Sequence, residues 1–299
     1  MLKVPQVIKT FFDSVPINTI DDQSNTQLDD INIDYFQGNN SCTSSSKFTL
    51  AVFNSMIEQD LILPTDPISL GYALLLSHKS KFTLPSSANK NSNEVKSNCG
   101  IVAMSHLGSP NNVLPIIIED IDNIRTIKNL DTINHEFTDK NFGDDQEAKL
   151  INQLIDIKFY DIWLQCILTE ELPYKILSEL FGLDISIEDN FVLQKSQMYE
   201  FLNQVPNWNS FKLRHPTLLD SGVWNTSHYL KNYYTIQISE FDQDFKLIID
   251  YLNKHPNSLL RYKVAGYVIS IDKFLKSTKL GEVVLNQPDF LVQCYELLA

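Results

Sequence analysis

The histidines and cysteines of this chain are the residues that could hold a metal ion or attack a substrate. None of them follows an HxH, HExxH or CxxC spacing, which would bring two ligands to one side of a helix or turn. The sequence therefore predicts no metal site. Cysteines so far apart indicate unpaired thiols in a reducing compartment. The residues concerned are His78, His106, His135, His215, His228, His255, Cys42, Cys99, Cys166 and Cys294.

Other catalytic motifs are also missing from the sequence. There is no glycine-rich phosphate loop, no GxSxG elbow and no kinase signature. Ser55 follows the first predicted strand and could act as a nucleophile, but no base accompanies it, so we interpret it as an ordinary loop serine. We expect no catalytic residue, no cofactor-binding residue and no cofactor.

Two carboxylates, Asp156 and Asp161, lie within the apolar stretch LINQLIDIKFYDIWLQCIL. A buried charge is costly unless it is paired, so at least one of them should meet an arginine such as Arg214 or a backbone amide. We expect this role to be structural. Trp208, Trp224 and the tyrosine-rich NTSHYLKNYYTI are predicted to lie in the core rather than at an interface.

The chain has 299 residues and a formal net charge of -13, from 24 basic and 37 acidic residues. This length suits about two domains. A net negative surface repels nucleic acids and anionic membranes. No segment looks like a secretory signal or a transmembrane helix of about 20 apolar residues, so neither is expected.

The first part of the chain reads as an α/β unit. Residues 18–46 are polar and are expected to be flexible, and order is predicted to begin at Lys47 with the strand KFTLAVF. Thr65 or Asp66 should cap a helix that has Pro67 in its first turn. A second strand is predicted at residues 81–84, followed by a polar loop and the apolar segment GIVAMSHL. Leu114-Pro115 then leads into another strand and is a candidate cis bond.

The second part has helical periodicity. Helices are predicted at residues 147–168, from Ser186 to about Val205, from Ser239 to His255-Pro256, at 258–276 and at 281–298. The predicted organisation is an N-terminal extension (1–46), a thioredoxin-like domain (47–130), a linker (131–145) and an all-helical domain (146–299). This order of an α/β unit and then an all-α unit is that of glutathione transferases, with Pro115 at their cis-proline position. The Glu-Ser or Gln-Ser pair expected of a glutathione site is missing from DNIRTIKNLDTINHEF.

The stretch LILPTDPISLGYALLLSHKSKFTLP resembles the metaxin version of this fold. Further blocks resemble the fungal metaxin-like receptor subunit of the mitochondrial sorting and assembly machinery (SAM, or TOB, complex). They are VPQVIKTFFDSVPI, SPNNVLPIIIED, KFYDIWLQCIL, SFKLRHP and LLRYKVAGYVISI, and they are spread over most of the chain.

The resemblance implies a non-enzymatic, peripheral protein on the cytosolic face of the mitochondrial outer membrane. It would bind the membrane-embedded assembly barrel and a second metaxin-like subunit, and help to receive β-barrel precursors through their C-terminal β-signal. The acidic charge could weakly favour a cationic element of that signal. A glutathione-dependent transferase and a soluble cytosolic adaptor are the alternatives.

The amphipathic N-terminal segment is the predicted contact with the barrel. Its apolar residues Val7, Ile8, Phe11 and Phe12 lie close together in the sequence. The same residues could instead pack against the protein's own domain, and the sequence leaves both possibilities open.

Overall fold

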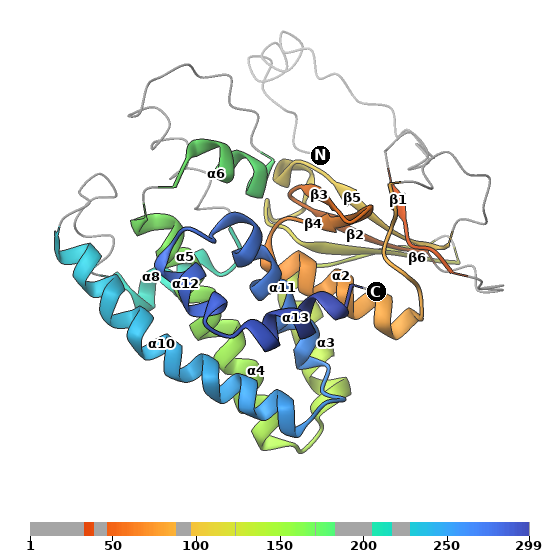
Figure 1. The fold of residues 1–299 in the computed structure, drawn as a ribbon. Helices are drawn as coiled ribbons and strands as arrows, with labels where there is room; N and C mark the ends of the chain where they lie inside the picture. The colour runs from red at the N-terminus through yellow and green to blue at the C-terminus, as the bar shows by residue number, and fades with distance from the viewer. Residues whose placement is uncertain are drawn as a thin grey trace, which may run out of the picture. The chain divides into compact units, whose positions relative to one another are not determined.

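The computed structural model describes residues 33–38, 47–87, 97–122, 124–170, 172–182, 205–216 and 228–298. Within these ranges the fold is mixed: an N-terminal β-sheet is followed by a largely helical part (Figure 1). The predicted order of an α/β part and then an all-α part is confirmed.

Five strands form the main sheet in the order β1-β5-β2-β6-β7. β5 runs parallel to β2, β6 antiparallel to β2, β7 antiparallel to β6, and β1 antiparallel to β5. The predicted strand at Lys47 is β2, the segment GIVAMSHL contributes β5, and the Leu114-Pro115 bond before β6 is cis, as expected. The strands are β1 (Asp34–Tyr35), β2 (Lys47–Val52), β5 (Cys99–Ala103), β6 (Ile116–Ile121) and β7 (Ile124–Lys128).

Order begins earlier than predicted, because β1 lies inside the stretch expected to be flexible. Phe36 follows this strand and is buried in the core, with 2% of its surface exposed. The predicted strand at residues 81–84 is wrong. Lys81 instead ends a helix with a left-handed backbone (φ 55°), and only Thr83 makes an isolated bridge, to Gln37.

A hairpin of β3 (Ser55–Glu58) and β4 (Leu61–Pro64) stands between β2 and the first helix. The sequence did not predict it. Its turn has positive φ at Gln59 and Asp60, 50° and 67°, a geometry usually signalled by Asn-Gly or Asp-Gly. Ser55, which was expected in a loop, lies on β3.

Helix α2 (Pro67–Ser80) follows the hairpin directly, and its predicted start is confirmed. The Asp66 carboxylate caps it by accepting a hydrogen bond of 2.8 Å from the Ser69 backbone N–H. Its inner face is buried at Leu70, Ala73 and Leu74.

The rest of the described chain is helical apart from its connections. The helix predicted at 147–168 is nearly continuous but contains the π-helical turn η3. Helix α10 ends where predicted but begins at His228 rather than Ser239, and the C-terminal segment forms two helices instead of one. Helix α3 lies within the predicted linker except for its first residue, Leu130, and the predicted helix start at Ser186 lies outside the described residues. The elements are η2 (His106–Gly108), α3 (Leu130–Phe142), α4 (Gln146–Leu154), η3 (Ile155–Phe159), α5 (Tyr160–Thr169), α6 (Tyr174–Phe181), α8 (Trp208–Arg214), α10 (His228–Lys254), α11 (Leu260–Phe274), α12 (Lys279–Leu285) and α13 (Pro288–Glu296).

Helix α2 packs closely against α11, and this contact joins the α/β part to the helical part (Figure 1). The two backbones meet at glycines. A Cβ atom on Gly266 would lie 2.4 Å from the Pro67 carbonyl oxygen and 2.5 Å from the Gly71 nitrogen. The Ser270 hydroxyl of α11 also donates a hydrogen bond of 2.9 Å to the Thr65 carbonyl.

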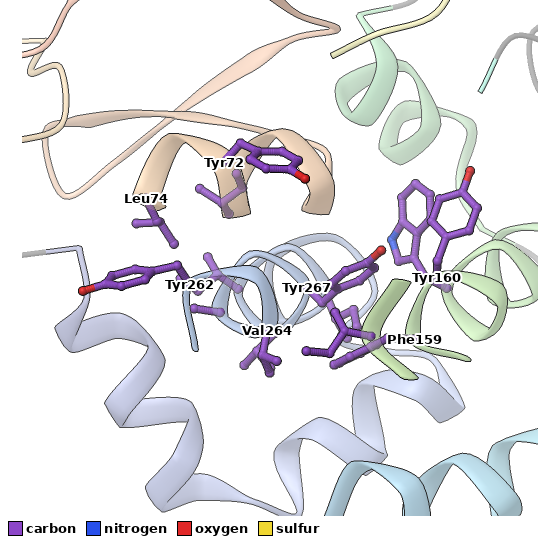
Figure 2. Close-up of a cluster of buried hydrophobic side chains, with 14 of the residues drawn as sticks. Tyr72, Leu74, Phe159, Tyr160, Tyr262, Val264 and Tyr267 are labelled. Atoms are coloured by element: carbon purple, nitrogen blue, oxygen red, sulfur yellow. The ribbon is translucent and has the colours of Figure 1, made fainter. Parts of the chain in front are cut away.

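Aromatic side chains surround this helix pair. Figure 2 shows Tyr72 on α2, Tyr267 on α11, and Phe159 and Tyr160 on the neighbouring helical run. The Phe159 and Tyr267 rings are stacked, with centroids 4.6 Å apart and planes 17° apart. The interface is therefore closed by tight backbone contact and by large buried rings.

Candidate functional site

Asp161 on α5 pairs with Arg214, the arginine that the sequence offered as one possible partner for Asp156 or Asp161. The Asp161 side chain is only 5% exposed, and it accepts hydrogen bonds from Arg214 Nη2 at 2.5 Å and Nε at 2.6 Å. Helix α8 positions Arg214, which is its last residue, and His215, which follows it. His215 was not predicted to take part, yet its Nε2 lies 2.9 Å from Asp161 Oδ2.

The partners decide the ionisation of Asp161. Burial alone would raise its pKa, but the hydrogen bonds from Arg214 and His215 outweigh burial and hold the pKa below the usual value. Since an ionised carboxylate only accepts, His215 Nε2–H is the donor. Nδ1 of the same ring shares a hydrogen bond of 2.9 Å with the Tyr233 hydroxyl on α10.

A cavity of about 240 Å³ opens beside this cluster, between α5, α8 and α10. Its wall combines apolar, acidic and basic side chains with the buried amide of Gln165. The lining residues are Ile157, Lys158, Asp161, Ile162, Gln165, Arg214, His215, Tyr233, Gln237, Glu240, Phe241 and Asp244.

The second carboxylate, Asp156, lies on the π-helical turn η3 and pairs with Lys263 of α11. Lys263 Nζ is 2.5 Å from Asp156 Oδ1 and 2.8 Å from Asn152 Oδ1, and its side chain is 7% exposed. The ammonium also lies 5.4 Å from the centroid of the Phe137 ring. Lys263 was not predicted as this partner, although a lysine within the apolar LLRYKVAGYVISI was an available signal.

The neighbouring cavity is small. It measures about 20 Å³ and is lined by residues of α2, α3, η3 and α11, among them Tyr72, Asn134 and Tyr267. The Tyr72 hydroxyl donates a hydrogen bond to Asn134 Oδ1 at its wall. A space of this size suits one water molecule rather than a substrate.

Asp66 is a third buried carboxylate, with 4% of its surface exposed. Burial raises its pKa, in spite of the hydrogen bonds from Ser69. Its Oδ2 atom has no hydrogen-bond partner in the described part of the chain. Asp66 therefore serves as a helix cap at an electrostatic cost.

The structure leaves several predicted residues without a test. Val7, Ile8, Phe11, Phe12 and Trp224 lie outside the described residues. Trp208 is buried, with 2% of its surface exposed, as predicted for a core position. Across the described ranges, no group of three or more His, Cys, Asp or Glu residues could hold a metal ion.

Comparisons with known proteins match both parts of the chain. The family model for SAM35, a subunit of the SAM complex, matches residues 2–119. The chain is also 24% identical over 314 residues to the "Sorting assembly machinery 35 kDa subunit" of Saccharomyces cerevisiae, covering 97% of this chain and 95% of that protein. This chain is similar to a SAM complex subunit. The resemblance to a SAM complex subunit inferred from the separate sequence blocks is thereby confirmed, and its metaxin-like part stays a prediction.

The family match ends inside β6, and the longer alignment extends the similarity to this SAM subunit through the helical part. In the portion that the structure describes, no helix combines the length and the apolar character needed to cross a membrane.

Proposed function

We propose that this protein is a non-enzymatic, peripheral subunit of the SAM complex on the cytosolic face of the mitochondrial outer membrane. The similarity to a sorting assembly machinery subunit over 97% of this chain and 95% of the relative carries the proposal. The protein would bind the assembly barrel and a second metaxin-like subunit. It would help to receive β-barrel precursors through their C-terminal β-signal.

We further propose a glutathione-transferase-like fold. In support, β2, α2 and β5 form a β-α-β unit with parallel strands, and β6, β7 and α3 follow as an antiparallel pair and a helix. A cis-proline precedes β6, and only helices follow α3 in the described residues. This is the order expected of a thioredoxin-like half followed by a helical half.

Three observations favour a binding role over a transferase with this fold. The β3–β4 hairpin lies between β2 and α2, where a catalytic loop could otherwise stand. Thr65 and Asp66 at the start of α2 serve structure, because Thr65 Oγ1 donates to the Leu180 carbonyl at 2.7 Å and Asp66 caps the helix. The cavity beside α2 measures about 20 Å³, whereas small-molecule sites occupy about 300–1,000 Å³.

Co-purification tests the proposed assembly. The tagged protein is expressed in its own cells, mitochondria are solubilised in digitonin, and the partners are identified by mass spectrometry. We expect an outer-membrane barrel and a second metaxin-like subunit to be recovered, and alkaline extraction to release the protein from membranes. Absence of any outer-membrane barrel from the purified material would contradict the proposal and favour a cytosolic adaptor.

The N-terminal contact is tested by deleting residues 1–17. If Val7, Ile8, Phe11 and Phe12 bind the barrel, the truncated protein should leave the complex while its thermal unfolding stays unchanged. Substitution of Lys3 and Lys9 by glutamine is the matched control, because it alters the same segment but leaves those four apolar side chains in place. Loss of both complex and thermal stability would instead indicate that the segment packs on its own domain.

Immobilised glutathione tests the enzymatic alternative. Neither specific retention nor turnover of a thiol-acceptor substrate is expected. Retention that free glutathione reverses, together with turnover, would replace the proposed role by a transferase activity.

A further inference from the structure

We propose that the cavity between α5, α8 and α10 receives a lysine or arginine side chain of a partner protein. The inference rests on the proposed role as a subunit of a complex, and it names the surface and the chemistry of one contact. Three features of the cavity support it: a buried acceptor, an excess of unneutralised carboxylates, and an exposed isoleucine next to the lining on α10.

The buried acceptor is the amide of Gln165. This side chain lines the cavity and is 1% exposed, and its Oε1 atom has no hydrogen-bond partner among the described residues. A buried amide oxygen without a donor destabilises the folded protein. The site therefore favours an occupant that brings N–H groups, as an ammonium or a guanidinium does.

The charges of the lining favour a cationic donor over an anion. Arg214 uses both Nε and Nη2 to bind Asp161, so that pair is internally neutralised. Glu240 and Asp244 remain, and neither has a basic partner within 4.0 Å in the described part of the chain. Lys158 is the other charged residue of the lining and is exposed, which leaves an excess of one negative charge.

An exposed aliphatic side chain adjoins the lining on α10. Ile236 is 58% exposed and lies three residues after Tyr233 and four before Glu240, a spacing that makes side chains neighbours on a helix. A peptide that inserts a cationic side chain would offer an apolar neighbour to Ile236, and arginine anchors in pockets are common hot spots of protein interfaces. This combination favours a protein segment over a free amine or a lipid headgroup.

A titration of the purified full-length chain tests the inference. The probe is N-acetyl-arginine amide, the neutral comparison is N-acetyl-citrulline amide, and the readout is the NMR shift of the Gln165 side-chain amide and of the α5 and α10 backbone amides. We expect saturable shifts with the arginine probe, and binding of the citrulline probe weaker by about ten-fold or more. Equal response to both probes, or no saturable shift around the cavity, would overturn the proposal.

Paired variants locate the effect. Glu240→Gln with Asp244→Asn should weaken arginine-probe binding about ten-fold, by removing two carboxylates of the wall. Asp250→Asn with Glu296→Gln removes the same charge from exposed positions outside the lining and should leave binding within about two-fold. An equal loss of arginine-probe binding in both double variants would show that net charge alone controls binding, and it would refute the site.

A lipid occupant is distinguished with phosphocholine and with vesicles of phosphatidylcholine. Shifts of the Gln165 amide by phosphocholine, with none by the arginine probe, would assign the cavity to a headgroup and overturn our inference. The titration uses the isolated protein, so its failure leaves the co-purification result standing. Conversely, a chain that binds the arginine probe but recovers no outer-membrane barrel would refute the proposed function alone.

Discussion

The α2–α11 interface and the cavity between α5, α8 and α10 solve the burial of a carboxylate in opposite ways. Beside α11, Asp66 has backbone donors but no cation, and burial raises its pKa. At the cavity, Asp161 is also buried, yet Arg214 and His215 hold its pKa below the usual value. Hydrogen-bonding and charged partners, rather than the depth of burial, therefore decide the charge state of these carboxylates. Of the two regions, only the second has a cavity large enough for a side chain of another molecule.

The largest effect should come from crowding the closed interface. Gly266→Ala would place a methyl group 2.4 Å from the Pro67 carbonyl oxygen and 2.5 Å from the Gly71 nitrogen, where only backbone could move. We expect a loss of about 3 kcal/mol in the free energy of unfolding, measured by urea denaturation, although alanine is the better helix former.

Substitutions of two further glycines test how the loss of stability depends on the atoms that the added methyl group meets. Gly71→Ala meets Lys263 Cα at 3.1 Å and should cost less than Gly266→Ala. Gly108→Ala meets only the flexible end of Met104, so its cost should stay within about 1 kcal/mol. Equal losses at all three positions would show that backbone contact does not control the α2–α11 interface.

The next effect concerns the ion pair of the cavity. Asp161→Asn leaves the Arg214 guanidinium, 30% exposed, without its carboxylate, and should cost about 2 kcal/mol in the same denaturation experiment. Asp120→Asn is the matched control, because its partner Arg125 is 49% exposed and such pairs contribute at most about 1 kcal/mol. If both variants lose the same stability, the buried position of Asp161 adds nothing.

The contributions of Asp161 and Asp66 to the free energy of unfolding should change with pH in opposite directions. Each change should be smaller than the effect of Asp161→Asn at neutral pH. The lowered pKa of Asp161 gives stability that is present above the unfolded-state value of about 3.9 and lost as pH falls through the folded-state pKa. The raised pKa of Asp66 gives a cost that appears as pH rises above about 3.9 and is complete above the folded-state pKa.

Unfolding between pH 7 and pH 3 checks these signs. The advantage of the wild type over Asp161→Asn should shrink toward acid, whereas the wild type should gain relative to Asp66→Asn, since asparagine also caps helices well. Parallel trends in the two variants would refute the contrast between the regions.

The smallest effect on stability should come from the surface beside the cavity. Ile236→Ser changes a side chain that is 58% exposed and should alter the free energy of unfolding by less than about 0.5 kcal/mol. The same change should reduce recovery of the partner complex in co-purification if the cavity accepts a partner segment. A large loss of stability would show that Ile236 supports the fold instead.

Local signals predicted much of the fold. Asp66 and Pro67 indicated the start of α2. The cost of burying Asp156 and Asp161 indicated that at least one would meet an arginine such as Arg214 or a backbone amide, and Arg214 does bind Asp161. Both inferences succeed because the physical demand, a helix cap or a counter-charge, is visible in the residue types themselves.

Tertiary structure explains what the sequence did not reveal. The β3–β4 turn has positive φ at Gln59 and Asp60 without the usual glycine signal. The Ser239-Glu240 signal looked like a helix start, yet α10 begins at His228, because packing of buried residues such as Tyr234 overrides a local cap. His215 joins Asp161 only through the three-dimensional arrangement of α5 and α8, and the barrel contact at Val7, Ile8, Phe11 and Phe12 stays a prediction.

The meeting of Gly71 and Gly266 has a consequence for how such a sequence can evolve. Since backbone touches backbone there, the spacing of α2 and α11 does not depend on the size of a side chain at the crossing. Residues around it can drift without displacing either helix, provided that both positions stay small. At 24% identity to the yeast subunit, we expect this pair to be a more reliable landmark for aligning distant relatives than the aromatic residues around it.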